Sequence, residues 1–159
     1  MSETIGKSIY DYGRDILSSD EIKAEKNFMQ HGDTSVYEHS LNVAYLSLYI
    51  VRRMNIRADE RAVVRGALLH DYFLYDWHIK SEKNRKHGFY HARRALINAR
   101  RDFMLSEIEE DIIRKHMFPL NITPPKYRES VVVCIADKIV AAAETLYLSR
   151  RLIKLNYAK

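Results

Sequence analysis

Apolar side chains recur three or four residues apart along most of the chain, beginning close to the first residue. A stripe with this spacing is typical of an amphipathic helix whose apolar face packs on a core. We therefore expect one or two helices within residues 1–30. Five apolar side chains of this segment are expected to reach the core, namely Ile5, Ile9, Ile16, Ile22 and Phe28.

Two short motifs mark the starts of later helices. Ser35 and Glu38 stand three residues apart, as do Ser106 and Glu109, and a stretch with helical spacing follows each pair. In a capping box of this kind, the serine and glutamate side chains satisfy backbone amides that the first helical turn leaves free. The sequence thus predicts that a helix begins at each pair.

Helices are expected over most of the chain after residue 34. The predicted set comprises residues 35–55, 58–72, 88–103, 106–116 and 126–154. Residues 31–34 and 74–86 are polar or aromatic, and we expect loops there. Residues 118–125 contain all three prolines, which lack a backbone N–H and restrict the preceding residue, so this stretch is expected to be irregular.

The composition supports a helical fold. The chain has 159 residues, of which 47% are hydrophobic and 30% charged, and it contains only 5 glycines and 3 prolines. A length of this order favours one domain, and few turn residues argue against an all-β sandwich. We predict an all-α, single-domain bundle of about 6–8 helices, in which residues 1–30 form an extension packed on residues 31–159.

Charge, hydropathy and cysteine content restrict the class of protein. The net charge is +5, but the basic residues are scattered, a pattern that favours steering of a small anionic substrate over nucleic-acid binding. No apolar run approaches the roughly 20 residues of a membrane span, and residues 1–10 do not resemble a signal peptide. The single cysteine, Cys134, excludes an internal disulfide and a multi-cysteine zinc site. We expect a cytoplasmic protein.

Several polar residues fall on the apolar faces of the predicted helices. These inward-facing residues are His39, His70, Asp71, His116 and Asp137. Taken singly, each histidine could be satisfied by a hydrogen bond, and Asp137 could face solvent. A buried carboxylate, however, normally becomes protonated or acquires a cation, and no lysine or arginine other than Lys138 is close on the same stripes. The joint pattern therefore favours a metal site, with donors that suit Fe, Mn, Zn, Co or Ni.

The order of these residues resembles the signature of the HD-domain metal-dependent phosphohydrolase superfamily. The similar motifs lie at residues 37–44, around His39, at residues 65–71, which end in His70-Asp71, and at residues 135–138, around Asp137. Two further stretches, residues 87–91 and 114–116, fall where two-metal members carry additional histidines. The resemblance covers about residues 32–144 and implies the helical bundle of that superfamily.

The resemblance also implies a set of ligands for one or two divalent ions. The first ion would be bound by His39, His70, Asp71 and Asp137. Asp71 would bridge to a second ion completed by His91 and His116. His91 is preferred to His87 because apolar residues follow it at helical spacing, although Ala92 stands where the family has proline. The chain also lacks the Gly-Tyr-Pro motif, and the Gly-Lys after His-Asp, of phosphodiesterases that cleave cyclic dinucleotides.

Such a site implies hydrolysis of a phosphate ester. Two such ions, about 3.5–4 Å apart, would lower the pKa of a bound water to near neutrality and neutralise a phosphoryl oxygen, which would favour in-line attack of the water on phosphorus. Asp71 or a nearby carboxylate is the candidate that accepts the proton, and His87 and Lys138 are candidates for binding the substrate. Weaker candidates for substrate contact are His31, Trp77, Lys86, Arg93 and Arg94.

The leading hypothesis is a hydrolase that acts on a small anionic phosphorylated metabolite, such as a nucleotide. A variant of it uses a single ion bound by the first four ligands. A second hypothesis is a di-iron oxygenase, because superfamily members that activate dioxygen share this order of ligands. A third is a sensor or interaction module without catalysis, although a degenerate site usually loses some of its ligands. Metal content and oxygen consumption distinguish the three.

Overall fold

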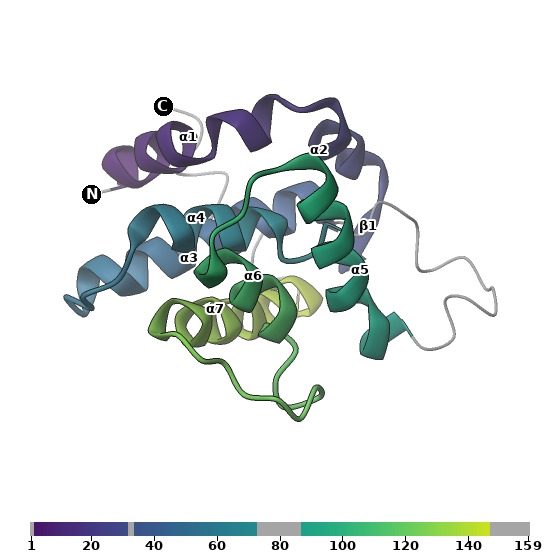
Figure 1. Ribbon diagram of the computed structural model, residues 1–159. Coiled ribbons are helices and arrows are strands. Elements are labelled where there is room, and N and C mark those ends of the chain that lie inside the picture. The colour runs from purple at the N-terminus through teal and green to yellow at the C-terminus, as the bar shows by residue number, and fades with distance from the viewer. Residues whose placement is uncertain (1, 32–33, 73–86, 147–159) are drawn as a thin grey trace.

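The computed structural model describes residues 2–31, 34–72 and 87–146 (Figure 1). Its α-helices are α1 (Ser2–Ser18), α2 (Asp20–Ala24), α3 (Val36–Arg53), α4 (Glu60–Leu69), α5 (His87–Asp102), α6 (Glu107–Lys115) and α7 (Arg128–Thr145). The shorter elements are the 3-10 helix η1 (Glu25–Asn27) and the strands β1 (Met29–His31) and β2 (Thr34–Ser35). The predicted helical bundle is confirmed.

Helix α4 is the central element of the bundle. It packs against α3, α6, α1 and α7, and Figure 1 shows α3 and α4 side by side between α1 and α7. Gly66 of α4 permits one of these contacts, because a Cβ there would lie 2.5–2.9 Å from side-chain atoms of Ile112 on α6. The close approach brings the C-terminal ends of α4 and α6 together, and both ends carry residues of the site described below.

Residues 2–27 are almost entirely helical, and this segment contributes to the core as expected. Ile5, Ile9, Ile16 and Ile22 are at most 3% exposed, whereas Phe28 is only half-buried. The four isoleucines join one apolar cluster with side chains of α3, α4, α6 and α7. The division of the chain into an extension and a domain at residue 31 stays a prediction.

Both capping boxes are present. The Ser35 hydroxyl accepts a hydrogen bond from the Glu38 amide, and the Ser35 amide donates to Glu38 Oε2 at 3.1 Å. Ser106 and Glu109 form the same pair of bonds at the start of α6. These starts were predictable because all the atoms involved lie within four consecutive residues.

The loop predicted for residues 31–34 is partly wrong. His31 and Thr34 belong to β1 and β2, a two-stranded antiparallel hairpin in which Met29 pairs with Ser35. The Val36 amide also donates to the Phe28 carbonyl at 2.8 Å. Strands of two or three residues are too short to produce an alternating pattern, so the sequence gives no sign of them.

Two helices are shorter than predicted. Helix α4 ends at Leu69, with His70 as its C-cap, and not near Tyr72. Helix α7 begins at Arg128 and ends at Thr145, and residues 147–159, where its predicted extension lay, are outside the described residues. The predicted loop at 74–86 is also outside them. None of the described helices combines the length and the apolar character needed to cross a membrane.

Candidate metal centre

Five helical segments converge on one buried polar cluster. Its members are His39 of α3, His70 and Asp71 at the end of α4, His91 of α5, His116 at the end of α6 and Asp137 of α7. Each is at most 8% exposed. The structure therefore brings together all six residues that the sequence pattern and the family resemblance pointed to.

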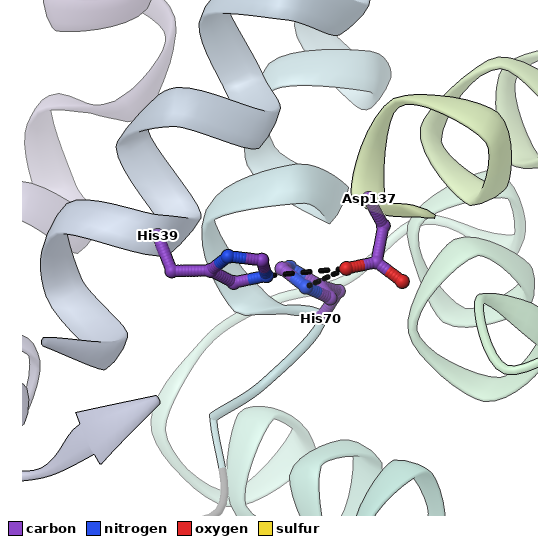
Figure 2. A group of neighbouring side chains, drawn as sticks. All are labelled: His39, His70 and Asp137. Carbon is purple, nitrogen blue, oxygen red and sulfur yellow. Dashed lines mark hydrogen bonds and ion pairs between the residues drawn. The ribbon is translucent and has the colours of Figure 1, made fainter. Parts of the chain in front are cut away.

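The first part of the cluster contains His39, His70 and Asp137, which Figure 2 shows converging from three helices. Asp137 Oδ1 lies 3.1 Å from His39 Nε2 and 3.5 Å from His70 Nε2. Asp71 Oδ2 lies 3.4 Å from His70 Nε2 and 3.8 Å from His39 Nε2. The ligand atoms of His39, His70 and Asp137 are close enough together to surround a single ion.

The second part of the cluster lies on the other side of Asp71. Asp71 Oδ1 is 3.3 Å from His91 Nε2 and 3.4 Å from His116 Nε2. The two nitrogens are 2.9 Å apart, and His70, Asp71 and His116 form a second group that could hold an ion. The two oxygens of one carboxylate thus face two different pairs of histidines.

The backbone and a third carboxylate fix the orientation of three imidazole rings. His70 Nδ1 donates to the Ala67 carbonyl at 2.7 Å, and His116 Nδ1 donates to the Ile113 carbonyl at 2.8 Å. His39 Nδ1 donates to Glu144 Oε2 at 2.8 Å. Histidines that bind metals almost always donate the second ring N–H in this manner. In each ring, the nitrogen that remains, Nε2, faces the carboxylates.

A cation fits this arrangement because the lone pairs of histidine Nε2 atoms face those of carboxylate oxygens. Once Nδ1 carries the ring proton, Nε2 of a neutral histidine offers a lone pair, and so does each oxygen of Asp71 and Asp137. His70 Nε2 and Asp71 Oδ1 are buried and have no hydrogen-bond partner among the described residues. Imidazole nitrogen and carboxylate oxygen are donors that Fe, Mn, Zn, Co and Ni accept.

The pKa shifts in the cluster indicate that its carboxylates favour a nearby positive charge. Burial opposes the charged form of His39, but hydrogen bonds to Asp137 and Glu144 outweigh it and raise the pKa of His39 to about 9. Burial likewise opposes a charge on His70, yet Asp71 raises the pKa of His70 well above its ordinary value. Burial would raise the pKa of Asp137, and the two histidines reverse that effect and lower it. Protons on the rings and a bound cation are alternative ways to balance the carboxylates.

The structure describes the side chain of only one of the two predicted substrate-binding residues, Lys138. Lys138 Nζ donates to the backbone carbonyls of His116, at 2.9 Å, and of Cys134, at 3.4 Å, so its ammonium already has backbone acceptors. His87 begins α5, but its side chain is outside the described part of the chain. Their roles in binding substrate stay predictions.

The roles of the weaker candidates for substrate contact also stay predictions. Arg93 and Arg94 are exposed on α5. Trp77 and Lys86 are outside the described residues, as is the side chain of His31.

Three polar residues of this region were not singled out in the sequence. Glu144 orients His39, and it stands seven residues after Asp137 on the same face of α7, a spacing that could have identified it. Gln30 Nε2 donates to Asp71 Oδ2, and Glu25 is buried with neither oxygen hydrogen-bonded to any described residue. No pattern in the sequence marked Gln30 or Glu25.

Comparison with known proteins gives one match. The sequence model of a family described as the HD domain matches residues 36–142, which include all six members of the cluster. No curated protein and no solved structure matches the chain significantly.

Proposed function

This chain belongs to the HD domain family, and from that premise we propose that it is a metal-dependent phosphohydrolase acting on a small phosphorylated metabolite such as a nucleotide. Members of the family are generally metal-dependent phosphohydrolases, and the buried His/Asp cluster is of the kind that could hold metal ions. The substrate and the two-ion arrangement are the finer parts of the proposal.

The position of Asp71 is the observation that supports two ions. In our proposal one ion is held by His39, His70, Asp137 and Asp71 Oδ2, and the other by His91, His116 and Asp71 Oδ1. The distances of 3.3–3.8 Å between Asp71 and the four histidines suit a carboxylate shared between two sites. Two bound divalent ions would supply Lewis acidity toward a phosphoryl oxygen and would lower the pKa of a water nucleophile.

The residues of the chain would contribute chiefly by holding this arrangement fixed. Ring N–H bonds to Ala67, Ile113 and Glu144 prevent His70, His116 and His39 from turning their Nε2 atoms away. Preorganised ligands of this kind need no rearrangement when the charge of the transition state develops.

The proton-accepting role of Asp71 stays a prediction. Burial would raise the pKa of this carboxyl, but His70 and the neighbouring histidines lower it well below its usual range. A carboxylate with a lowered pKa is a weak base. We therefore assign Asp71 to binding the ions.

Metal analysis followed by an activity screen tests the proposal. The full chain is purified without chelator under aerobic and anaerobic conditions, its metals are counted, and phosphomonoesters and phosphodiesters are tested with each metal. We expect bound ions and phosphate release that a chelator abolishes. Oxygen consumption with an iron signal in electron paramagnetic resonance (EPR) would favour the oxygenase, and a protein with neither metal nor turnover would contradict both enzymes.

A further inference from the structure

The residues that precede the matched domain also reach the cluster. Gln30 lies in β1, six residues before the family match begins, and is 7% exposed. The hairpin that carries it is tied to the start of α3 by the pairing of Met29 with Ser35 and by the bond from Val36 to Phe28. The position of Gln30 is therefore coupled to the helix that bears His39.

Gln30 contacts the one carboxylate that both halves of the cluster share. Its Nε2 donates to Asp71 Oδ2, the oxygen that faces His39 and His70, while Asp71 Oδ1 faces the other two histidines. The terminal torsion of an aspartate is broad, so its own backbone does not fix the plane of the carboxylate. Among the described residues, the Gln30 amide is the hydrogen-bond donor that reaches Asp71 from outside the six-residue cluster.

The chemistry of Gln30 indicates that its role is to donate. Its Oε1 is buried and has no hydrogen-bond partner among the described residues, which costs free energy, whereas its Nε2 is engaged. The opposite amide orientation would set an oxygen against the Asp71 oxygen. A glutamine thus supplies a donor to Asp71 without adding charge to an acidic site.

We infer that Gln30 is a positioning residue that holds the Asp71 carboxylate in the plane needed to bridge two divalent ions. This inference rests on the proposed function. The ion between His91 and His116 depends more strongly on the orientation of Asp71, because Asp71 is the carboxylate that the described residues place beside these two histidines. The ion between His39 and His70 also has Asp137.

Two variants without the amide test this role. Methionine in Gln30→Met is similar to glutamine in length, and leucine in Gln30→Leu is similar to it in volume. Neither side chain can donate a hydrogen bond to Asp71. If one variant misfolds, the other still tests the role. Glu25→Gln is the matched control. Glu25 is buried in the segment just before Gln30. Burial, and to a smaller extent repulsion from Asp71, raises the pKa of Glu25 well above its usual range. Glutamine therefore preserves the neutral form of this side chain.

The readout is the binding of Mn²⁺ to the full chain, followed by EPR, with metal counted independently. For the wild type and Glu25→Gln we expect two ions and the spectrum of a coupled pair. For the Gln30 variants we expect one ion to bind 10–100-fold more weakly, the usual consequence of losing an outer hydrogen bond to a ligand, together with the signal of an isolated ion. Melting temperatures of the metal-free proteins should stay alike.

The outcomes separate this inference from the proposed function. A wild-type chain that binds no metal overturns both. A wild type with a coupled pair, and Gln30 variants that keep that pair at the same affinity, overturns the inference alone. Equal loss in Glu25→Gln also overturns it, because the effect would then not belong to the Gln30 amide.

Discussion

Helix α4 bears two buried polar clusters that differ in how they are balanced. Near its middle, Arg65 donates to Asp15 at 2.5 and 2.7 Å, to Glu109 at 2.7 Å and to the Met104 carbonyl at 3.2 Å. Arg65 and Glu109 are at most 4% exposed. Each carboxylate there meets a guanidinium N–H, so this cluster, which we call the Arg65 cluster, is complete within the protein.

The cluster at the end of the same helix is not balanced in this way. Asp71, Asp137 and Glu144 are buried, and the described residues offer them imidazoles and the amides of Gln30 and Asn42 but no lysine or arginine ion pair. One helix thus carries a charge network, buried except for the exposed Asp15, that satisfies itself and another that requires protons or cations. The comparison teaches that unmatched acceptors, and not burial of polar groups alone, distinguish a binding site from a structural network.

The largest expected effect comes from removing the shared carboxylate. Asp71→Asn keeps the shape of the side chain but removes its charge and one of its two acceptor oxygens. We expect loss of both ions, a fall in metal affinity beyond the 10–100-fold typical of outer partners, and no turnover. Metal counting after gel filtration checks this, with circular dichroism to confirm folding. Full metal content in Asp71→Asn would refute the shared-ligand assignment.

The Arg65 cluster should respond in the opposite manner. Arg65→Met leaves the buried Glu109 carboxylate without its cation, which typically costs about 3–5 kcal/mol. We expect that loss in the free energy of unfolding by urea, measured with chelator present, and no change in the number of ions per folded chain.

A surface pair provides the control for Arg65→Met. Arg100 forms a two-bond ion pair with Glu110, but its side chain is 56% exposed. Arg100→Met should therefore cost less than about 1 kcal/mol. Similar losses in the two variants, or loss of metal in Arg65→Met, would show that the two clusters of α4 are not distinct in the way we describe.

A narrower change should divide the metal cluster itself. His91→Ala removes a ligand candidate from one side of Asp71 and leaves His39, His70 and Asp137 in place. We expect one ion to be lost at concentrations that still saturate the other, so that a two-step titration becomes a single step. Retention of two steps with unchanged affinities would remove His91 from the ligand set.

A smaller effect is expected from the carboxylate behind His39. Glu144→Gln keeps an acceptor for the His39 ring but removes a charge, so ligand basicity falls. The ion on the His39 side should bind about tenfold more weakly, at the low end for outer partners, and the other ion should be unaffected. Isothermal titration with Zn²⁺ and a competing chelator measures both affinities. An equal loss of affinity at both sites would contradict the assignment of Glu144 to the ion on the His39 side.

The mildest test is the pH dependence of metal binding. Because hydrogen bonds raise the pKa of His39 to about 9, the ring is protonated at pH 7 in the absence of metal, and an ion must displace that proton. Apparent affinity should rise from pH 7 toward pH 9 by about tenfold per pH unit for each proton displaced, and His70, whose pKa is also raised, supplies a second such proton. Titrations in buffers of different ionisation enthalpy detect the released proton. Affinity that is flat across this range would contradict the pKa of His39.

Local features of this fold could be predicted from the sequence. The isoleucine stripe of α1 and the two capping boxes depend on residues within one or two helical turns, so spacing alone identifies them. The same spacing predicted that His39 and Asp137 face the core, and the family resemblance added His91. Spacing showed that these residues face a core, and the family resemblance implied that they meet at one site.

The remaining features depend on contacts between distant residues. The bond between His39 and Glu144 joins residues 105 positions apart, and that between Gln30 and Asp71 joins residues 41 apart. Which inward-facing residues meet depends on crossing angles and on close approaches such as the one at Gly66, which spacing does not encode. Spacing could therefore mark the ligand candidates, and Glu144 as an inward-facing residue, but it could not show that Glu144 contacts His39 or that Gln30 contacts Asp71.

Anomalous X-ray diffraction from crystals soaked in Mn²⁺ tests the central claim most directly. The account predicts two anomalous peaks, one beside each oxygen of Asp71, with His39 and His70 around the first and His91 and His116 around the second. A structure at saturating Mn²⁺ with no peak in this cluster, or with Asp71 bound to neither ion, would contradict it.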